Sequence, residues 1–308
     1  LTLLDSISLS IQPNEFVGIL GPSGAGKSML MNVMNGVRPA DSGSVLVNNL
    51  DLHRHLDSLK QSIGFVPQDD IIHRELTVYR TLYYVAKLRL SRDVSSDEIK
   101  QIVDEVMDVT GLAERRNLSV HELSGGQRKR VSIAVELITK PSIIFLDEPT
   151  SGLDPAAEER IMKLFRQIAE SGRTIILTTH YIEEAEQMAD RIGVINHGEI
   201  IRVQEKHELM QELGRKQLIV HLHEPLSQIP ELLASYALEL AGDGARLIYT
   251  YETRAARTGI TTLLRQLGDA GIRFHDIDTN ESSLEEIFVG LVKQGARPGG
   301  QAVTGGAP

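Results

Sequence analysis

The sequence predicts an α/β protein with a mostly parallel sheet, followed by a smaller α+β domain, and three observations support this fold class. Short, continuously apolar segments alternate with helical patterns over roughly the first 210 residues, as in parallel sheets covered by helices. A glycine-rich turn containing a lysine joins the first apolar segment to a helical pattern. Beyond about residue 213, apolar and polar residues alternate with a period of two, which indicates half-buried strands.

Composition is that of a globular protein and excludes several functions. The 308 residues are 41% hydrophobic and 24% charged, enough for two cores. The net charge of −10 argues against nonspecific binding to nucleic acid or anionic lipid. Cysteine is absent, which excludes disulfides and thiol nucleophiles and fits a reducing cytoplasm. No apolar run approaches the roughly 20 residues of a bilayer span, and no signal peptide is visible. The chain begins with Leu1, at the expected edge of a strand, which predicts that further residues precede it.

The elements of the first part follow from local patterns. Ser95 and Glu98 form a capping-box pattern before a helix, and Pro155 stands at a tolerated first-turn position. Residues 191–201 read as a hairpin turning at 196–198. Apolar runs predict strands, and periodicity near 3.6 predicts helices: strands at 16–20, 63–67, 142–148 and 173–180, and helices at 27–35, 76–90, 95–112, 124–139 and from 155.

The second part has the order βαββαβ with a terminal helix, which predicts a split βαβ, ferredoxin-like arrangement. Its expected strands are 216–224, 238–240, 245–252 and 272–278, and its expected helices are 226–236, 258–267 and one capped at Ser282. These patterns predict a first domain over 1–213, with a helical subdomain at about 69–140, and an accessory domain over 214–294. Residues 295–308 are mainly Gly, Pro and Ala and are predicted to be disordered.

Residues 21–28 (GPSGAGKS) match the phosphate-loop pattern G-x-x-x-x-G-K-[ST], with a strand before and a helix after. The loop residues would close their backbone around a polyphosphate: Gly21, Pro22, Ser23, Gly24, Ala25 and Gly26. Lys27 would place its charge at the β- and γ-phosphates, and the Ser28 hydroxyl would bind Mg²⁺. The alternative is an ordinary glycine-rich turn.

Three polar residues follow buried strands. Asp147 ends the strand at 142–148 and is the expected second Mg²⁺ anchor. Glu148 points the other way and is the candidate general base. His180 ends another apolar strand and can hydrogen-bond the γ-phosphate or the attacking water. The alternatives are that both carboxylates only cap a turn and that His180 is structural.

A second glycine-rich stretch, LSGGQRKRVSIAVEL, begins at Leu123. Gly125 and Gly126 leave backbone N–H groups open at an expected helix start, which suits a phosphate. No lysine-bearing phosphate loop adjoins it. An ordinary helix start is the alternative.

These motifs, in this order, resemble the ATP-binding subunits of ABC transporters over about residues 1–210. The resemblance implies an ABC-type P-loop NTPase fold, ATP and Mg²⁺ as ligands, and ATP hydrolysis. It also implies head-to-tail pairing of two subunits. Ser124, Gly125, Gly126 and Gln127 would then hold the γ-phosphate of ATP bound to the other subunit, and Asp154 would cross the same interface. Gln68 resembles the glutamine that contacts Mg²⁺ and water, in a loop that touches the membrane partner.

Finer similarities point to one transporter class. The stretch VPQDDIIHRELTVYRTLYYVAKLRL resembles the ABCG (White-type) subfamily and its bacterial relatives, whereas the region beyond Gly214 resembles daunorubicin-resistance-type exporter ATPases. Both groups serve membrane domains of the ABC-2 type. The resemblance thus implies an exporter subunit that forms a homodimer. It also implies a position at the cytoplasmic face of the membrane, held there by an ABC-2-type permease or a fused membrane domain. The usual adenine-stacking aromatic residue would precede Leu1, and Met29 stands where Thr is frequent.

Rival interpretations are weaker. A soluble, non-transport ABC ATPase acting on DNA would need a coiled-coil insertion, yet only about 95 residues separate Lys27 from Ser124. Ribosome-acting members carry two cassettes, and this chain has one. A regulator without turnover would not need Glu148 and His180.

Two other sequence features are not interpreted as sites. The pair His221 and His223 lacks a third metal ligand and is read as a solvated face. The run QRKR at 127–130 is read as a helix face rather than a nucleic-acid site.

Overall fold

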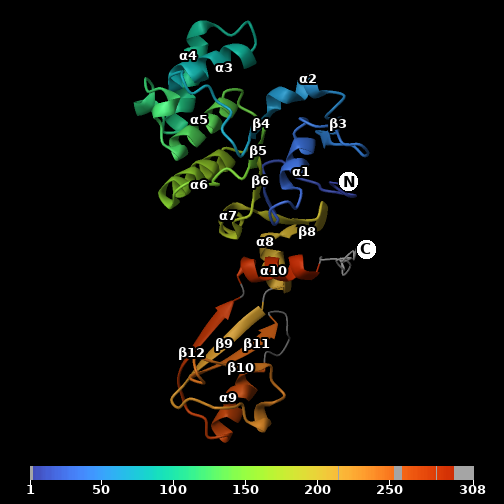
Figure 1. The fold of residues 1–308 in the computed structure, drawn as a ribbon. Helices are drawn as coiled ribbons and strands as arrows, with labels where there is room; N and C mark the ends of the chain where they lie inside the picture. The colour runs from blue at the N-terminus through green and yellow to red at the C-terminus, as the bar shows by residue number, and fades with distance from the viewer. Residues whose placement is uncertain (1–2, 214, 253–258, 282, 295–308) are drawn as a thin grey trace, which may run out of the picture. The chain divides into compact units, whose positions relative to one another are not determined.

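The computed structural model describes residues 3–213, 215–252, 259–281 and 283–294 (Figure 1). It divides into two compact units, Leu1–Val203 and Gln204–Pro308. This division falls earlier than the expected boundary after residue 213, because helix α8 (Lys206–Leu213) is grouped with the second unit and contacts its helix α10 (Leu284–Gln294). The tail predicted to be disordered, 295–308, lies outside the described residues.

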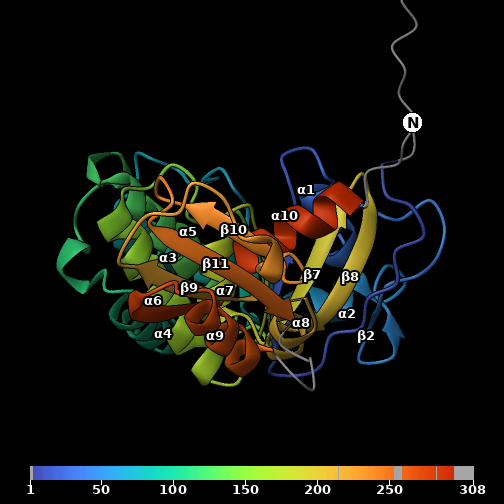
Figure 2. The same cartoon turned by 90° about the horizontal axis from the view of Figure 1, so that it is seen from below.

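The first unit is built on a six-stranded sheet with the order β4-β5-β6-β1-β7-β8. The neighbouring pairs from β4 to β7 are parallel, so the predicted mostly parallel sheet is confirmed. β7 and β8 lie side by side, joined only by residues 197–198, which confirms the predicted hairpin (Figure 2). The strands are β1 (Phe16–Leu20), β4 (Ile63–Val66), β5 (Ile143–Asp147), β6 (Thr174–Thr179), β7 (Arg191–Asn196) and β8 (Glu199–Glu205).

Helices cover both faces of this sheet. Helix α1 (Lys27–Met34) lies on one side, and α5 (Gly125–Leu137) and α6 (Pro155–Glu170) lie on the other (Figure 1). The core on the α1 side joins apolar side chains of α1 to those of the strands, with Met31 and Val17 fully buried. All six residues of β6 are buried, as expected for a strand covered on both faces.

A helical part adjoins the sheet. Helices α3 (Val78–Arg89), α4 (Ser96–Val109) and α5 contact one another. The predicted capping box at Ser95 is present, with Glu98 as its reciprocal partner. Short elements escaped prediction: α2 (Leu56–Leu59), α7 (Ile182–Met188) and the two-residue strands β2 (Leu46–Val47) and β3 (Leu50–Asp51). The strand expected at the chain start is absent from residues 3–15.

The second unit is a four-stranded antiparallel sheet with the order β10-β11-β9-β12. Its first strand lies between its third and fourth, as the predicted split arrangement requires. Leu263 and Leu267 of α9 (Ile260–Asp269) pack on one face of the sheet (Figures 1 and 2). The strands are β9 (Arg215–Leu222), β10 (Leu238–Ala241), β11 (Arg246–Glu252) and β12 (Phe274–Glu281).

The prediction of a helix at 226–236 was wrong. Only a 3₁₀ turn, Glu231–Leu233, forms there. Pro230 precedes it with φ −60° and ψ 144°, an extended conformation, and proline lacks the N–H that would continue a helix across this point. The buried Leu233 still packs into the core of this unit, so the apolar pattern reflected burial without a full helix.

Candidate functional site

The loop between β1 and α1 has a backbone that requires glycine. Gly24 and Gly26 have φ values of 79° and 106°, in the left-handed region where other residues are strained. A Cβ atom on Gly21 would lie 2.5 Å from the Ile195 carbonyl oxygen. The loop therefore approaches β7 closely and leaves N–H groups at the start of α1 for an anion.

Lys27 is buried and its ammonium group contacts three acceptors, two of them in this loop. Its Nζ donates to the carbonyl oxygens of Gly21 at 2.8 Å and Pro22 at 3.2 Å. The same nitrogen lies 3.0 Å from Glu148 Oε1. The side chain of Lys27 is 4% exposed and that of Glu148 is 14% exposed, so solvent screens this ion pair only weakly.

Glu148 leaves β5 in a left-handed conformation, with φ 43°. Such a conformation costs a non-glycine residue about 1–3 kcal/mol and persists only where its surroundings impose it. Here the Glu148 N–H donates to the Thr178 carbonyl oxygen at 3.0 Å, and the Ser151 N–H donates to the Glu148 carbonyl at 3.2 Å. The turn thereby aims the carboxylate away from Asp147 and towards Lys27 and His180.

The sheet order brings the other predicted residues to the same edge. Because β6 lies between β5 and β1, their carboxyl ends are adjacent. His180 follows β6 and places Nδ1 3.1 Å from Glu148 Oε2. Asp147, only 6% exposed, accepts a hydrogen bond of 2.6 Å from the Thr178 hydroxyl. The structure thus brings Lys27, Asp147, Glu148 and His180 together at one edge of the sheet.

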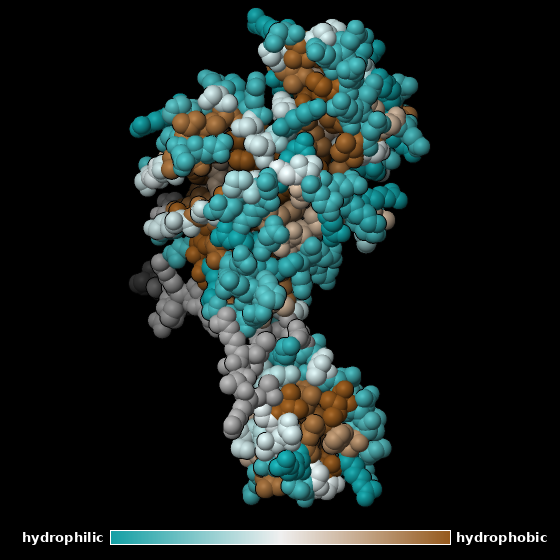
Figure 3. All heavy atoms as spheres, turned by 180° about the vertical axis from the view of Figure 1, so that it is seen from behind, coloured by the Kyte–Doolittle hydropathy of each residue, from teal (hydrophilic) through white to brown (hydrophobic). Residues whose placement is uncertain are grey.

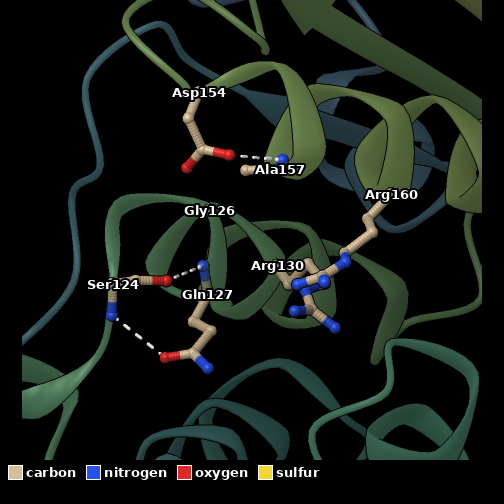
Figure 4. Close-up of a pocket in the computed structure, with 7 residues that line it drawn as sticks. All are labelled: Ser124, Gly126, Gln127, Arg130, Asp154, Ala157 and Arg160. Carbon is tan, nitrogen blue, oxygen red and sulfur yellow. Dashed lines mark hydrogen bonds between the residues drawn. The ribbon is translucent and has the colours of Figure 1, made fainter.

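A second group surrounds the start of α5 (Figure 4). Ser124 is the N-cap residue: its Oγ accepts from the Gln127 N–H at 3.4 Å, while Gln127 Oε1 accepts from the Ser124 N–H at 3.0 Å. Since Ser124 Oγ only accepts in this pair, its hydroxyl proton remains available for a phosphate oxygen. Asp154 caps α6 by accepting from the Ala157 N–H at 2.9 Å.

Close packing holds this second group together. A Cβ atom on Gly126 would lie 2.6 Å from Ala157 Cβ, so glycine is needed where α5 meets α6. These residues line a pocket with Arg130 and Arg160 (Figure 4). Burial lowers the pKa of Arg130, and the positive charges of Arg160 and Arg115 lower it further. An anion in this pocket would be favoured by the two guanidinium groups.

The structure brings the first group together but does not join it to the second. Among the described residues, no hydrogen bond or ion pair links Ser124, Gln127 or Asp154 to Lys27 or Glu148. Gln68, which follows β4, is exposed. Its backbone carbonyl accepts a hydrogen bond of 2.7 Å from Lys129.

Sequence reasoning missed several supporting side chains. Thr178 holds Asp147, and the next residue, Thr179, donates to the buried Glu184 at 2.5 Å. Thr150 donates to the same carboxylate. Burial raises the pKa of Glu184, although both hydroxyl hydrogen bonds act in the opposite direction. Polar residues inside a buried strand, such as the two threonines, were the available signal, because buried polar groups need partners.

The oxygen donors near the loop fit Mg²⁺. Among the described residues, no group of three or more His, Cys, Asp or Glu side chains is arranged to hold a metal ion. Mg²⁺ does not require such a cage, because it is usually bound through one or two carboxylates together with waters and substrate phosphates. Asp147 offers one buried carboxylate, and Ser28 is an exposed hydroxyl at the start of α1.

The sheet, the loop at its edge and the carboxylate beside the lysine define a nucleotide-binding protein of the phosphate-loop class. Comparison with known proteins makes the assignment specific. Residues 4–151 match the family model described as "ABC transporter". The chain is 32% identical over 291 residues to the daunorubicin resistance ATP-binding protein DrrA3 of Streptomyces coeruleorubidus, covering 94% of this chain and 90% of that protein. The chain belongs to the family of ABC transporter ATP-binding proteins.

Two further similarities bear on this family. The chain is 43% identical over 190 residues to the ABC transporter ATP-binding/permease protein Rv1747 of Mycobacterium tuberculosis, covering 61% of this chain and 22% of that protein. The dimeric structure of a post-hydrolysis state of the ATP-binding cassette MJ0796, bound to ADP and Pi, has a TM-score of 0.60 at 31% identity. It covers 66% of this chain and 90% of the cassette. The expected family, fold and ATP hydrolase activity are therefore confirmed.

Proposed function

We propose that the chain is the ATP-hydrolysing subunit of an ABC-2-type exporter and works at the cytoplasmic face of the membrane. The observation that carries this proposal is the split phosphate chemistry. One group contains the lysine loop, Asp147, Glu148 and His180, and the other contains the helix start at Ser124 without any lysine. Two copies arranged head to tail would complete two sites. The dimeric MJ0796 cassette supports such pairing.

In the proposed cycle, phosphates of ATP take the place of Glu148 beside Lys27. The released Glu148 carboxylate then accepts a proton from the attacking water, and His180 orients that water or the γ-phosphate. Mg²⁺, held by Ser28, Asp147 and Gln68, would neutralise charge on the phosphates. Ser124, Gly125, Gly126 and Gln127 of the second copy would hold the γ-phosphate, with Asp154 at the same interface.

A membrane partner is proposed because the similarity to the daunorubicin resistance protein extends over 94% of this chain. This extent favours a transporter subunit over a soluble ABC ATPase.

No helix among the described residues is long and apolar enough to cross a membrane. On the face that Figure 3 shows, hydrophilic residues cover most of the first unit, and apolar side chains gather in separate groups, some over its helical part.

The surface proposed to meet the permease follows Gln68. Ile71 is 83% exposed, and Leu88 and Tyr84, one turn apart on α3, are 84% and 49% exposed. We further propose that residues 214–294 support dimerisation or regulation, because every residue assigned to ATP lies before them.

The test is capture of the permease. The tagged chain, expressed with its neighbouring genes, should co-purify a polytopic ABC-2-type membrane protein from detergent-solubilised membranes. Leu88→Glu should reduce this capture at least tenfold, whereas Val109→Glu, at a 53% exposed position on α4, should not. Failure to co-purify any membrane protein, with ATPase activity intact, would support the soluble alternative instead.

A further inference from the structure

Lys129 is a buried lysine in the first unit that the assigned ATP chemistry does not use. It lies in the basic run 127–130, and its side chain is 4% exposed. The neighbouring arginines are committed to backbone carbonyls: Arg128 donates to Leu123 at 2.5 Å, and Arg130 donates to Thr110 and Gly111. The arginines of this run therefore bind backbone carbonyls of their own chain, and Lys129 is the most buried residue of the run.

The ammonium group of Lys129 is satisfied by the segment that carries Gln68. Its Nζ donates to the carbonyl oxygens of Pro67 at 3.2 Å and Gln68 at 2.7 Å. It also lies 3.2 Å from Asp70 Oδ1. An ammonium has three N–H donors, so three acceptors from residues 67–70 account for all of them.

Two further residues on α5 bind the same segment. The Ser132 hydroxyl donates to Asp70 Oδ1 at 2.8 Å. Glu136 Oε2 accepts from the Phe65 N–H at 3.2 Å. Positions 132 and 136 lie three and seven residues after position 129, so all three share one helix face. This face contacts the segment from Phe65 to Asp70.

The N-terminal end of α5 carries the proposed phosphate seat. Ser124 caps the helix and Gly125 begins it, so Lys129 lies little more than one turn from that seat. A helix transmits displacement along its axis as a rigid element, and its two ends move together. Lys129 fixes the backbone at Gln68 to the helix that holds the partner ATP.

We propose that Lys129 is a positioning residue that couples Gln68 to the signature helix, so that seating of the γ-phosphate on one copy sets the place of Gln68 in that copy. This inference rests on the proposed role of Gln68 at the Mg²⁺ and water site. Lys129 does not touch the nucleotide and acts through the Gln68 main chain. The strand end β4, the loop and α5 then respond to ATP as one body.

The test is a double-mutant cycle on the full chain, read by steady-state ATP hydrolysis. Lys129→Met removes the ammonium group and should lower kcat about 10- to 100-fold, the range for a displaced positioning group, while KM for ATP changes less than threefold. In a Gln68→Ala background, Lys129→Met should lower kcat less than threefold further, because coupled residues are not additive. Lys140→Met is the matched control: Lys140 follows the same helix and its pair with Glu105 is exposed.

Normal kcat in Lys129→Met, or full additivity with Gln68→Ala, would overturn the coupling role. If Gln68→Ala alone hydrolyses ATP normally, the proposed role of Gln68 fails instead. Should Lys129→Met give little folded protein, Asp70→Asn loosens the same loop by neutralising one acceptor. It should reproduce the kcat loss and the non-additivity on a smaller scale, and additivity there would equally refute the proposal.

Discussion

Lys27 Nζ and Glu148 Oε1 lie 3.0 Å apart, so the lysine of the phosphate-loop motif is paired with the candidate base. Both side chains are largely buried. The pair keeps either charge from being left alone in a low-dielectric site, which would be costly. In the proposed cycle, phosphates of ATP replace Glu148 beside Lys27, which frees the carboxylate to act on water.

The first prediction concerns Glu148→Gln. The amide keeps the size of the side chain but cannot accept a proton, so hydrolysis should fall about 10²–10⁴-fold. Lys27 loses its carboxylate partner, so ATP should bind at least as tightly as to the unaltered chain. Size-exclusion chromatography with and without ATP should show a stable ATP-loaded dimer. Near-normal turnover would place the base elsewhere.

The second prediction concerns the two phosphate groups. Ser124→Arg should obstruct the seat at α5 while leaving the Lys27 loop intact, and Lys27→Ala should do the reverse. When the two variants are mixed, a dimer with one chain of each kind has one composite site in which both the Lys27 loop and the Ser124 seat are unaltered. ATP-driven pairing, measured by sizing of differently tagged chains, should therefore partly survive in the mixture and be poor in each variant alone. Equal pairing in all three samples would remove support for sharing between subunits.

The third prediction uses two adjacent glycines. Gly126→Ala places a Cβ atom 2.6 Å from Ala157 Cβ, and such overpacking should lower the free energy of unfolding by about 1–3 kcal/mol. Gly125→Ala is the matched control, because its Cβ atom would lie 3.6 Å from Leu153 Cδ2, an ordinary contact. Urea unfolding followed by circular dichroism compares them. Equal stability of the two variants would show that the start of α5 yields to an added methyl group.

The fourth prediction concerns residues after 213. The second unit has its own core around Leu218, Val220 and Leu247, and all residues assigned to ATP precede it. A chain truncated after Leu213 should therefore bind ATP nearly as well as the full chain, with dimer lifetime more strongly affected. Isothermal titration of the folded, truncated chain measures this. A loss of affinity beyond tenfold, about 1.4 kcal/mol, would mean that this region helps to build the nucleotide site.

The sequence could place the candidate catalytic residues near one another because they lie at the ends of predicted strands. Asp147 ends β5, Glu148 directly follows it, and His180 directly follows β6. Parallel strands present such ends at one edge of a sheet. The left-handed conformation of Glu148 could not be foreseen, since it depends on Thr178 of a neighbouring strand accepting its N–H.

Residues that act through distant contacts were harder to predict. Lys129 reads as one more charge on a polar helix, and only the fold shows that the Gln68 segment covers it. The short α7 was missed for a similar reason: Glu184 is charged, yet it is 2% exposed because two threonine hydroxyls bind it. The 3₁₀ turn at Glu231–Leu233 shows the opposite error, in which apolar spacing suggested a helix that Pro230 prevents.

The reciprocal hydrogen bonds between Ser124 and Gln127 have a consequence for the unpaired subunit. They satisfy backbone donors at the start of α5 without any phosphate, so this surface needs no ligand to be folded. Under the proposed head-to-tail pairing, a single subunit would therefore remain folded at this surface until ATP and a second copy complete the site.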